Sequence, residues 1–231
     1  MPPVDEPLKV PGFDQAFSFS TLLEAWRRAR RGAGGSAACL AFGFQLEPEL
    51  LRLEDELLIG RYRPGGYRLF TVREPKLRLI AEAPLRDRVV HHALVAMLEP
   101  LWEPGFDPDS YATRKGKGTH RAVRRAQGLL REHRWYLKSD IRSCFASIDL
   151  QTLLRLVAER LTDTRMLELL MRVLHADPRL PGLPIGNLTS QFLANVYLDG
   201  FDRWLADELA LPGVVRYMDD FVLSRMTRPC C

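Results

Sequence analysis

The residues with the clearest chemical potential are Tyr217-Met218-Asp219-Asp220, which lie between the apolar segments 214–215 and 221–223. Two adjacent carboxylates in a tight turn create a dense negative charge, which a cation, protonation or full exposure to water must relieve. Asp also tolerates turn geometry well, so an ordinary Asp-rich hairpin turn is the alternative interpretation. The pair alone does not distinguish a metal site from a turn.

A third carboxylate, Asp140, favours the metal site. The segment 135–141 predicts a strand that ends near this residue. If that strand neighbours the segment 214–223 in one sheet, the carboxylates meet at one edge, and oxygen ligands of this kind suit Mg²⁺. Two such ions about 3.5–4 Å apart can activate an attacking hydroxyl and stabilise a leaving pyrophosphate. We therefore expect two Mg²⁺ ions, or Mn²⁺ in their place, whereas Asp149 is expected to cap a helix that begins near Leu150.

The elements that must position these carboxylates follow from periodicity and turn residues. Alternating apolar residues predict a β-hairpin with strands 67–72 and 77–81. Helical spacing predicts helices over about 21–31, 47–59, 86–101, 150–161 and 164–175, one after Gly118 and one from about 187. Thr21 and Glu24 form the capping box of the first helix. Hairpins and helices without regular alternation predict an α+β fold.

Composition limits the class of protein. The chain has 231 residues, a formal net charge of +4 and a hydrophobic fraction of 46%, which supports a packed core. No apolar run approaches the ~20 residues that cross a bilayer, and the N-terminus lacks the pattern of a signal peptide. The Cys residues show no metal-ligand spacing, so neither a zinc site nor a disulfide scaffold is expected. We therefore expect a cytoplasmic protein without a membrane partner.

Positive charge concentrates between Thr113 and Arg134. In this stretch a single acid, Glu132, opposes eight basic residues: Arg114, Lys115, Lys117, Arg121, Arg124, Arg125, Arg131 and Arg134. Those at 121, 124 and 125 share one face of the predicted helix. Such a stretch commonly meets phosphates, so the first six of the eight are candidate nucleic-acid contacts. A solvated helix face is the alternative.

Five segments in a fixed order resemble the motifs of one enzyme family. YLKSDIRSCFASID, GLPIGNLTSQFLANVYL and RYMDDFVL are similar to motifs A, B and C of reverse transcriptases. Upstream, FTVREPKLRLIAEAPLRDRVVHHAL and SYATRKGKGTHRA resemble the finger motifs of bacterial retroelement enzymes. The resemblance covers about residues 67–223. It implies an RNA-directed DNA polymerase that transfers a nucleotide from a dNTP to a primer 3′-hydroxyl, with an RNA template and a DNA or RNA primer as partners.

The resemblance also implies a role for individual residues. Asp140, Asp219 and Asp220 match the catalytic metal ligands. Phe145 matches the aromatic steric gate that packs beneath the sugar and rejects a 2′-hydroxyl, although without the motif it would be read as a core aromatic.

Two basic residues of the predicted hairpin, Lys76 and Arg78, match those that hold the incoming triphosphate. Arg suits this role because its guanidinium can donate two hydrogen bonds to phosphate oxygens. Outside this family context, both residues would be read as surface charges.

Motif B distinguishes subclasses. Gly186 and the following helix match the segment against the nascent base pair, where Gly allows close backbone approach. Group II intron and retroviral enzymes usually have Gln before this glycine and Ser-Pro after it, whereas this chain has Ile185 before it and Ser190-Gln191 after it. That form resembles the error-prone enzymes of diversity-generating retroelements, which typically work with a small basic accessory protein. Group II intron and phage-defence enzymes are the alternative subclass.

The family pattern predicts a right-hand polymerase with an antiparallel palm sheet. Residues 1–90 are expected to form the N-terminal fingers region and 91–231 the palm, with a helical fingers insertion at about 150–182. Relatives usually continue past motif C into a thumb, which is expected to be absent because the sequence stops after Ser224-Arg-Met-Thr-Arg-Pro-Cys-Cys231. A non-catalytic RNA-binding remnant and a metal-dependent nuclease are therefore the alternative functions.

Overall fold

The computed structural model describes residues 11–32, 35–73 and 76–226. Of the C-terminal segment that begins at Ser224, residues 227–231 lie outside this range. The helices are α1 (Phe13–Ala16), α2 (Phe19–Ala29), α3 (Ala37–Phe44), α4 (Leu46–Leu58), α5 (Leu85–Trp102), α6 (Thr119–Glu132), α7 (Cys144–Ser147), α8 (Leu150–Ala158), α9 (Thr164–Leu174) and α10 (Leu188–Arg203), which continues as a π-helical turn over Trp204–Glu208. The strands are β1 (Arg68–Arg73), β2 (Leu77–Glu82), β3 (Trp135–Asp140), β4 (Gly213–Tyr217) and β5 (Asp220–Arg225).

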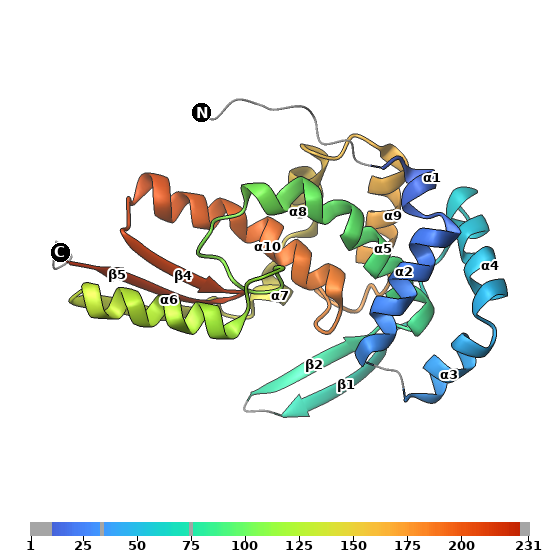
Figure 1. The fold of residues 1–231 in the computed structure, drawn as a ribbon, viewed down its shortest axis with the longest axis horizontal. Helices are drawn as coiled ribbons and strands as arrows, with labels where there is room; N and C mark the ends of the chain where they lie inside the picture. The colour runs from blue at the N-terminus through green and yellow to red at the C-terminus, as the bar shows by residue number, and fades with distance from the viewer. Residues whose placement is uncertain (1–10, 33–34, 74–75, 227–231) are drawn as a thin grey trace.

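Helix α5 runs through the middle of the helical body (Figure 1). It buries residues on every side, from Leu85 to Trp102, as expected for a helix that other helices surround. Helices α2 and α10 pack on it, and the main hydrophobic core extends from Phe13 to Met218. Residue 90, which the sequence assigns to the end of the first region, lies inside α5, so this core is shared across the predicted boundary.

The β1–β2 hairpin confirms the sequence prediction. Its two strands are antiparallel, with Arg68 opposite Glu82 and Arg73 opposite Leu77. The hairpin projects from the helical body toward the end of the molecule that holds α6 (Figure 1). It therefore carries Lys76 and Arg78 away from the main core.

The second sheet is antiparallel with the order β3-β5-β4, so the predicted neighbourhood of the two carboxylate-bearing segments is confirmed. Helix α6 covers one face, where Ala122, Ala126 and Leu129 pack with Val215. Helix α10 covers the opposite face, where Phe201 contacts Phe221 at a ring-centroid distance of 5.4 Å (Figure 1). The described residues thus form a mixed helix and sheet fold, and no helix in them is both long and apolar enough to cross a membrane.

Candidate active site

The pairing of the three-stranded sheet brings the carboxylates to one end. Asp140 is directly opposite Asp220, and Asp220 is opposite Tyr217 on the other side. Residues that face each other in an antiparallel pair point to the same side of the sheet, with Cβ atoms about 4.5–5.5 Å apart. Asp219 lies in the turn before β5, and its carbonyl oxygen accepts a 3.0 Å hydrogen bond from the Ile141 amide. The backbone pairing therefore places Asp140 beside Asp220 and Asp219 in the adjoining turn, at one end of the sheet.

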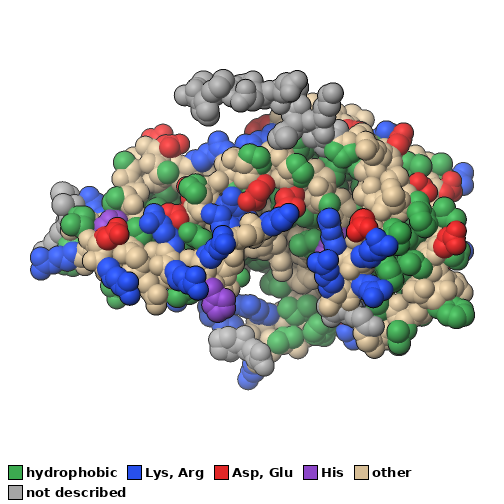
Figure 2. Space-filling view, in the orientation of Figure 1, with side chains coloured by type: hydrophobic (Ala, Val, Ile, Leu, Met, Phe, Trp, Pro, Cys, Tyr) green, Lys and Arg blue, Asp and Glu red, His purple; other side chains and the backbone are tan. Residues whose placement is uncertain are grey.

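A pocket of about 530 Å³ separates the β1–β2 hairpin from the end of the sheet that carries the carboxylates. In the space-filling view, the hollow between the hairpin and the rest of the protein is visible (Figure 2). Six of the residues singled out in the sequence line this pocket: Lys76, Arg78, Asp140, Phe145, Ile185 and Asp219. Carboxylates, basic side chains and an aromatic ring from three distant segments thus meet in one cavity, to which a fourth segment adds Ile185.

The charges in this pocket are of opposite sign. The Lys76 ammonium lies 3.7 Å from a carboxylate oxygen of Asp140, and both side chains are mostly exposed. An exposed pair of this kind contributes little stability, so it can be exchanged for another cation or for a phosphate. Burial raises the pKa of the Cys144 thiol, and the nearby charge of Asp219 raises this pKa further.

The carboxylate oxygens at this site are the kind of ligand that magnesium prefers, but they do not form a complete coordination shell. Across the described ranges, no three His, Cys, Asp or Glu side chains already stand together as a metal-binding group. Mg²⁺ usually takes only one or two protein carboxylates and completes its shell with water and substrate phosphates. Asp140 and Asp219 could supply these carboxylates from the pocket wall, and the Lys76 ammonium shows that a cation is accommodated beside Asp140.

Phe145 lies in the short helix α7 between the carboxylate end of β3 and helix α8. Its side chain lines the pocket and also packs, half-buried, against the main core. Its carbonyl oxygen accepts a 2.7 Å hydrogen bond from the Leu183 amide. The loop that contains Ile185 is therefore fixed to the helix that carries Phe145. As predicted, Asp149 caps α8, since its carboxylate accepts a 2.7 Å hydrogen bond from the Thr152 amide.

Gly186 adopts a left-handed conformation with φ of +116°, and a Cβ there would stand 3.0 Å from Ile80 of β2. The Ala81 amide donates a 2.8 Å hydrogen bond to the Ile185 carbonyl, and the Asn187 side chain donates a 2.9 Å bond to the Ala81 carbonyl. The close approach that requires glycine is thus to the β-hairpin of this chain. Gln191 does not line the carboxylate pocket; its side chain accepts a 3.3 Å hydrogen bond from Thr113.

The predicted nucleic-acid contacts separate into exposed and engaged side chains. Arg121 and Arg124 are exposed on α6, and Lys115 is exposed in the preceding loop. Arg125 forms a bidentate ion pair with Asp109, and Lys117 donates to the Pro108 carbonyl.

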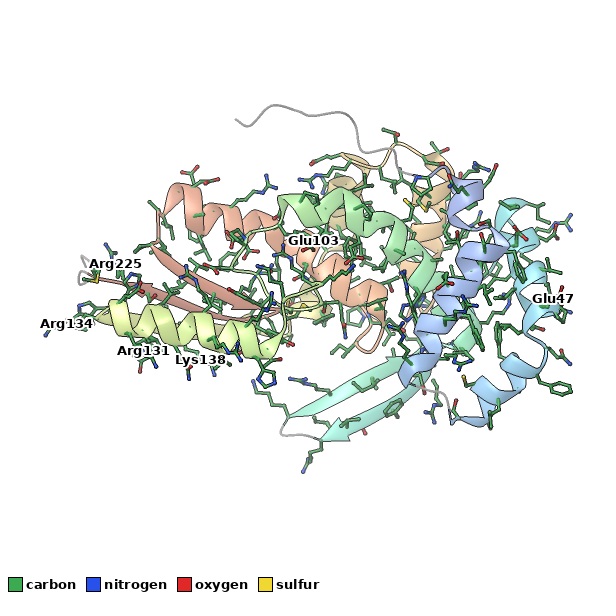
Figure 3. All side chains as sticks on the ribbon, viewed as in Figure 1. Glu47, Glu103, Arg131, Arg134, Lys138 and Arg225 are labelled. Carbon is green, nitrogen blue, oxygen red and sulfur yellow. The ribbon has the colours of Figure 1, made fainter. Side chains whose placement is uncertain are left out.

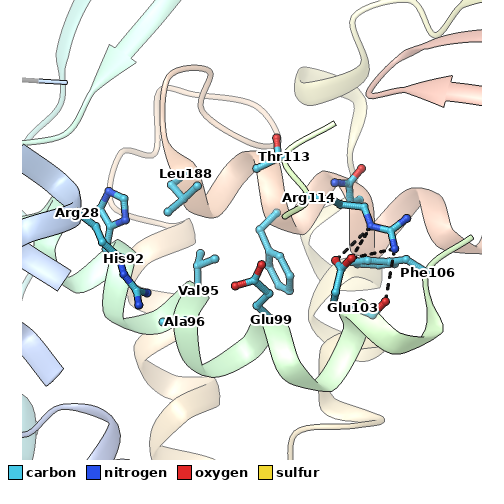
Figure 4. A pocket seen from close by; sticks show the side chains of 12 residues that line it. Arg28, His92, Val95, Ala96, Glu99, Glu103, Phe106, Thr113, Arg114 and Leu188 are labelled. Carbon is cyan, nitrogen blue, oxygen red and sulfur yellow. Dashed lines mark hydrogen bonds and ion pairs between the residues drawn. The ribbon is translucent and has the colours of Figure 1, made fainter. Parts of the chain in front are cut away.

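Arg114 corrects the sequence interpretation. Its side chain is only 6% exposed, and it binds Glu103 and two backbone carbonyl groups (Figure 4). It lies against a second, smaller pocket of about 180 Å³ that contains none of the three carboxylates. Because its guanidinium is buried and already bound to these acceptors, we remove Arg114 from the candidate nucleic-acid contacts.

Two groups of residues were not assigned to the site from the sequence. Arg131, Arg134 and Lys138 lie at the end of the molecule that α6 and the three-stranded sheet form (Figure 3), and their side chains are exposed. Lys138 pairs with Val222 and precedes Asp140 by two positions, so it shares the face of Asp140. Arg131 and Arg134 belong to the run of positive charge between Thr113 and Arg134, which was a signal for them in the sequence.

Arg216, directly before the Tyr217-Met218-Asp219-Asp220 segment, is almost fully buried. Nothing in the composition distinguished Arg216.

The chain matches a family model described as reverse transcriptase (RNA-dependent DNA polymerase) over residues 72–228. It is 33% identical over 176 residues to the protein YkfC of Escherichia coli strain K12, covering 70% of this chain and 46% of that protein. It is 27% identical over 176 residues to the group II intron-encoded protein LtrA of Lactococcus lactis, covering 71% of this chain and 29% of LtrA. The chain thus spans less than half the length of these relatives.

The fold also resembles a solved structure. A chain of a partial Cas6-RT-Cas1–Cas2 complex aligns with a TM-score of 0.53 and 22% identity, covering 93% of this chain and 38% of that chain. The family match includes all three carboxylates and every residue that lines the pocket between the β-hairpin and the pair Asp140 and Asp219. The chain therefore belongs to the reverse transcriptase, or RNA-directed DNA polymerase, family.

Proposed function

We propose that the chain carries out RNA-templated DNA synthesis at the pocket between the β1–β2 hairpin and the carboxylate end of the sheet. The observation that carries this proposal is the meeting of Asp140 and Asp219 with Lys76 and Arg78 in one cavity. A dNTP needs both sets of groups, because its triphosphate is anionic and its reaction requires metal-bound oxygens. Asp140, Asp219 and Asp220 would hold two Mg²⁺ ions, or Mn²⁺ in their place, which supply charge stabilisation for nucleotidyl transfer.

The remaining pocket residues fit the substrate in distinct ways. Lys76 and Arg78 approach from the hairpin and would bind the triphosphate, with Arg able to donate two parallel hydrogen bonds. Phe145 would lie beneath the sugar and exclude a 2′-hydroxyl. Ile185 would pack near the new base pair, on a loop that Gly186 holds against β2.

Template and primer would lie along the basic surface outside this pocket. We define this surface by its exposed basic residues: Lys115, Arg121, Arg124, Arg131, Arg134 and Lys138. Basic side chains colour much of the α6 side of the molecule (Figure 2). Backbone phosphates release counterions when such residues bind them, so binding should weaken steeply as salt rises. Lys117 would contribute from the adjoining loop and Arg125 from α6. Gln191, on α10, would instead act on the substrate side, with the motif B segment that follows Gly186.

In the polymerase arrangement, residues 1–90 would form the fingers region and the three-stranded sheet would belong to the palm. The helical segment at about 150–182 would return to the fingers. Helix α5 crosses the first boundary and shares the main core with both parts, which would limit movement between them.

Different observations support two subclasses of reverse transcriptase for this chain. Ile185 before Gly186 favours a low-fidelity enzyme of a diversity-generating retroelement with a small basic accessory protein. The similarity to LtrA favours the group II intron-encoded type. Copying accuracy opposite template adenine distinguishes them, because the first type is expected to misincorporate there and the second is not.

Extension of a labelled DNA primer on an RNA template tests the proposed activity. With dNTPs and Mg²⁺, elongation by single nucleotides is the expected result. Shortened products would instead indicate a metal-dependent nuclease, and binding without any change in length would indicate a non-catalytic RNA-binding protein. Replacing both Arg121 and Arg124 with Gln should weaken template–primer binding and reduce its dependence on salt.

A further inference from the structure

Arg216 of β4 is buried beneath the carboxylate turn, with a side chain that is 1% exposed. An arginine carries five N–H donors, and here every one has an acceptor. Nε and Nη2 each bind an oxygen of Asp202 at 2.6 Å, and Nη2 also donates to the Ser110 hydroxyl at 2.9 Å. Nη1 donates to the Asn195 side-chain oxygen at 3.1 Å and to the Met218 carbonyl at 3.0 Å.

These acceptors belong to three separate parts of the chain. Asp202 and Asn195 lie on α10, the helix of motif B, and Ser110 lies in the loop before α6. The backbone of Arg216 binds the same loop, since its amide donates to Asp109 and its carbonyl accepts from Tyr111, both at 2.9 Å. One residue therefore connects the motif B helix, the loop of the upstream finger motif and the carboxylate turn.

The contact with Met218 bears directly on the carboxylates. Met218 has a φ of +60°, a left-handed conformation that is unfavourable for residues other than glycine. Such a conformation persists only where its surroundings hold it. The Met218 carbonyl belongs to the peptide that joins Met218 to Asp219, so the hydrogen bond from Arg216 fixes the orientation of the peptide from which Asp219 projects.

We propose that Arg216 is a positioning residue that holds the Met218-Asp219 turn in the conformation in which its carboxylates bind divalent metal. The inference rests on the proposed function only in taking Asp219 and its neighbours as metal ligands. It assigns no contact between Arg216 and substrate. A lysine cannot replace it, because three donors on one nitrogen cannot reach acceptors that surround a planar fork.

Mn²⁺ binding provides a readout that does not depend on catalysis. The test variant is the double replacement Arg216→Met and Asp202→Leu. It removes the hydrogen bonds of the Arg216 guanidinium, which we call the clamp, without leaving a buried charge unpaired. Free Mn²⁺ is measured by electron paramagnetic resonance during titration of the purified full chain. We expect affinity at least about tenfold weaker than in the wild type, the scale at which supporting residues affect metal sites.

The matched control is Tyr62→Phe, which removes an equally buried hydrogen bond of 2.7 Å to Asp87 in the N-terminal part. It should reduce stability without changing Mn²⁺ affinity. If the double variant does not fold, Ser110→Ala removes one acceptor and leaves the ion pair intact. This variant should weaken Mn²⁺ binding by about threefold, in line with the loss of one hydrogen bond.

The outcomes separate this inference from the proposed function. Folded variants with wild-type Mn²⁺ affinity would refute the positioning role, even if the wild type extends primers. A wild type that binds Mn²⁺ tightly, loses this binding in the clamp variant and never elongates a primer would support the clamp and overturn the polymerase activity. An equal loss of affinity in Tyr62→Phe would show general destabilisation and would refute the role of Arg216.

Discussion

Replacing Gly182 with Ala should reduce the stability of the protein and displace Phe145, the residue proposed to lie beneath the sugar. Gly182 has a φ of +61°, and a Cβ added there would stand 2.3 Å from the Phe145 carbonyl oxygen and 2.8 Å from that of Ala146. Both obstacles are backbone atoms of α7, so no change of rotamer relieves them. To reach ordinary van der Waals contact, the loop or α7 must move by about 1 Å.

The size of the effect follows from three costs. The left-handed conformation costs an alanine roughly 1–2 kcal/mol, and overpacking typically adds about 1–3 kcal/mol. Movement of α7 also weakens the hydrogen bond from Leu183 to Phe145, which is worth roughly 0.5–1.5 kcal/mol. We expect a loss of about 3–5 kcal/mol in the free energy of unfolding, against a typical total of roughly 5–15 kcal/mol.

Urea unfolding followed by circular dichroism measures this loss. The control is Gly200→Ala on α10, where an added Cβ meets nothing within 4 Å and should stabilise the helix by about 0.5–1 kcal/mol. Discrimination between dNTPs and rNTPs should also fall in Gly182→Ala, because Phe145 moves with α7. An unchanged unfolding midpoint, with m unchanged, would refute the account of how the loop supports Phe145.

Three further predictions address single side chains. Phe145→Ala should increase incorporation of rNTPs relative to dNTPs in primer extension, and unchanged discrimination would make Phe145 a core residue alone. Ile185→Gln should change the errors opposite template adenine, since Gln can donate a hydrogen bond that Ile cannot; identical error spectra in sequenced products would count against the low-fidelity interpretation. Burial, aided by the charges of Arg88 and Arg28, lowers the pKa of His92 to about 4. Because the unfolded chain then binds the proton first, His92 should contribute to a loss of stability as the pH falls from about 6.5 toward 4, and His92→Gln should reduce this loss in urea titrations.

Local sequence signals predicted most of the elements but not all of their ends. Strand alternation identified the β1–β2 hairpin, and Asp149 was correctly predicted as the cap of α8. Helix α2 begins at Phe19 after Ser18, so the predicted capping box at Thr21 was wrong. The Thr21 hydroxyl instead donates to the Gln15 carbonyl. Helix α3 was missed, because its nearly continuous apolar sequence has no helical periodicity.

The site was predictable where ordered motifs fix residue roles, and less so where tertiary contacts decide them. Asp140, Asp219, Lys76 and Phe145 share one pocket, as the family pattern implied. Arg114 belongs to the same charge run as Arg121, yet it is buried against Glu103, which only the folded loop could reveal. The role inferred for Arg216 depends on partners up to 106 positions away in the chain, so no local pattern could indicate it.

The proposed RNA-templated DNA synthesis depends on Asp219 and its neighbours as the metal-dependent centre. The most direct test compares primer extension on an RNA template by the wild type and by Asp219→Asn, with template–primer affinity measured in parallel. Asn keeps the size of the side chain but removes the charge that would bind the metal. We predict that the wild type extends the primer in Mg²⁺ and that the variant binds the same template–primer with nearly unchanged affinity but does not extend it. Wild-type extension rates in Asp219→Asn would contradict the assignment.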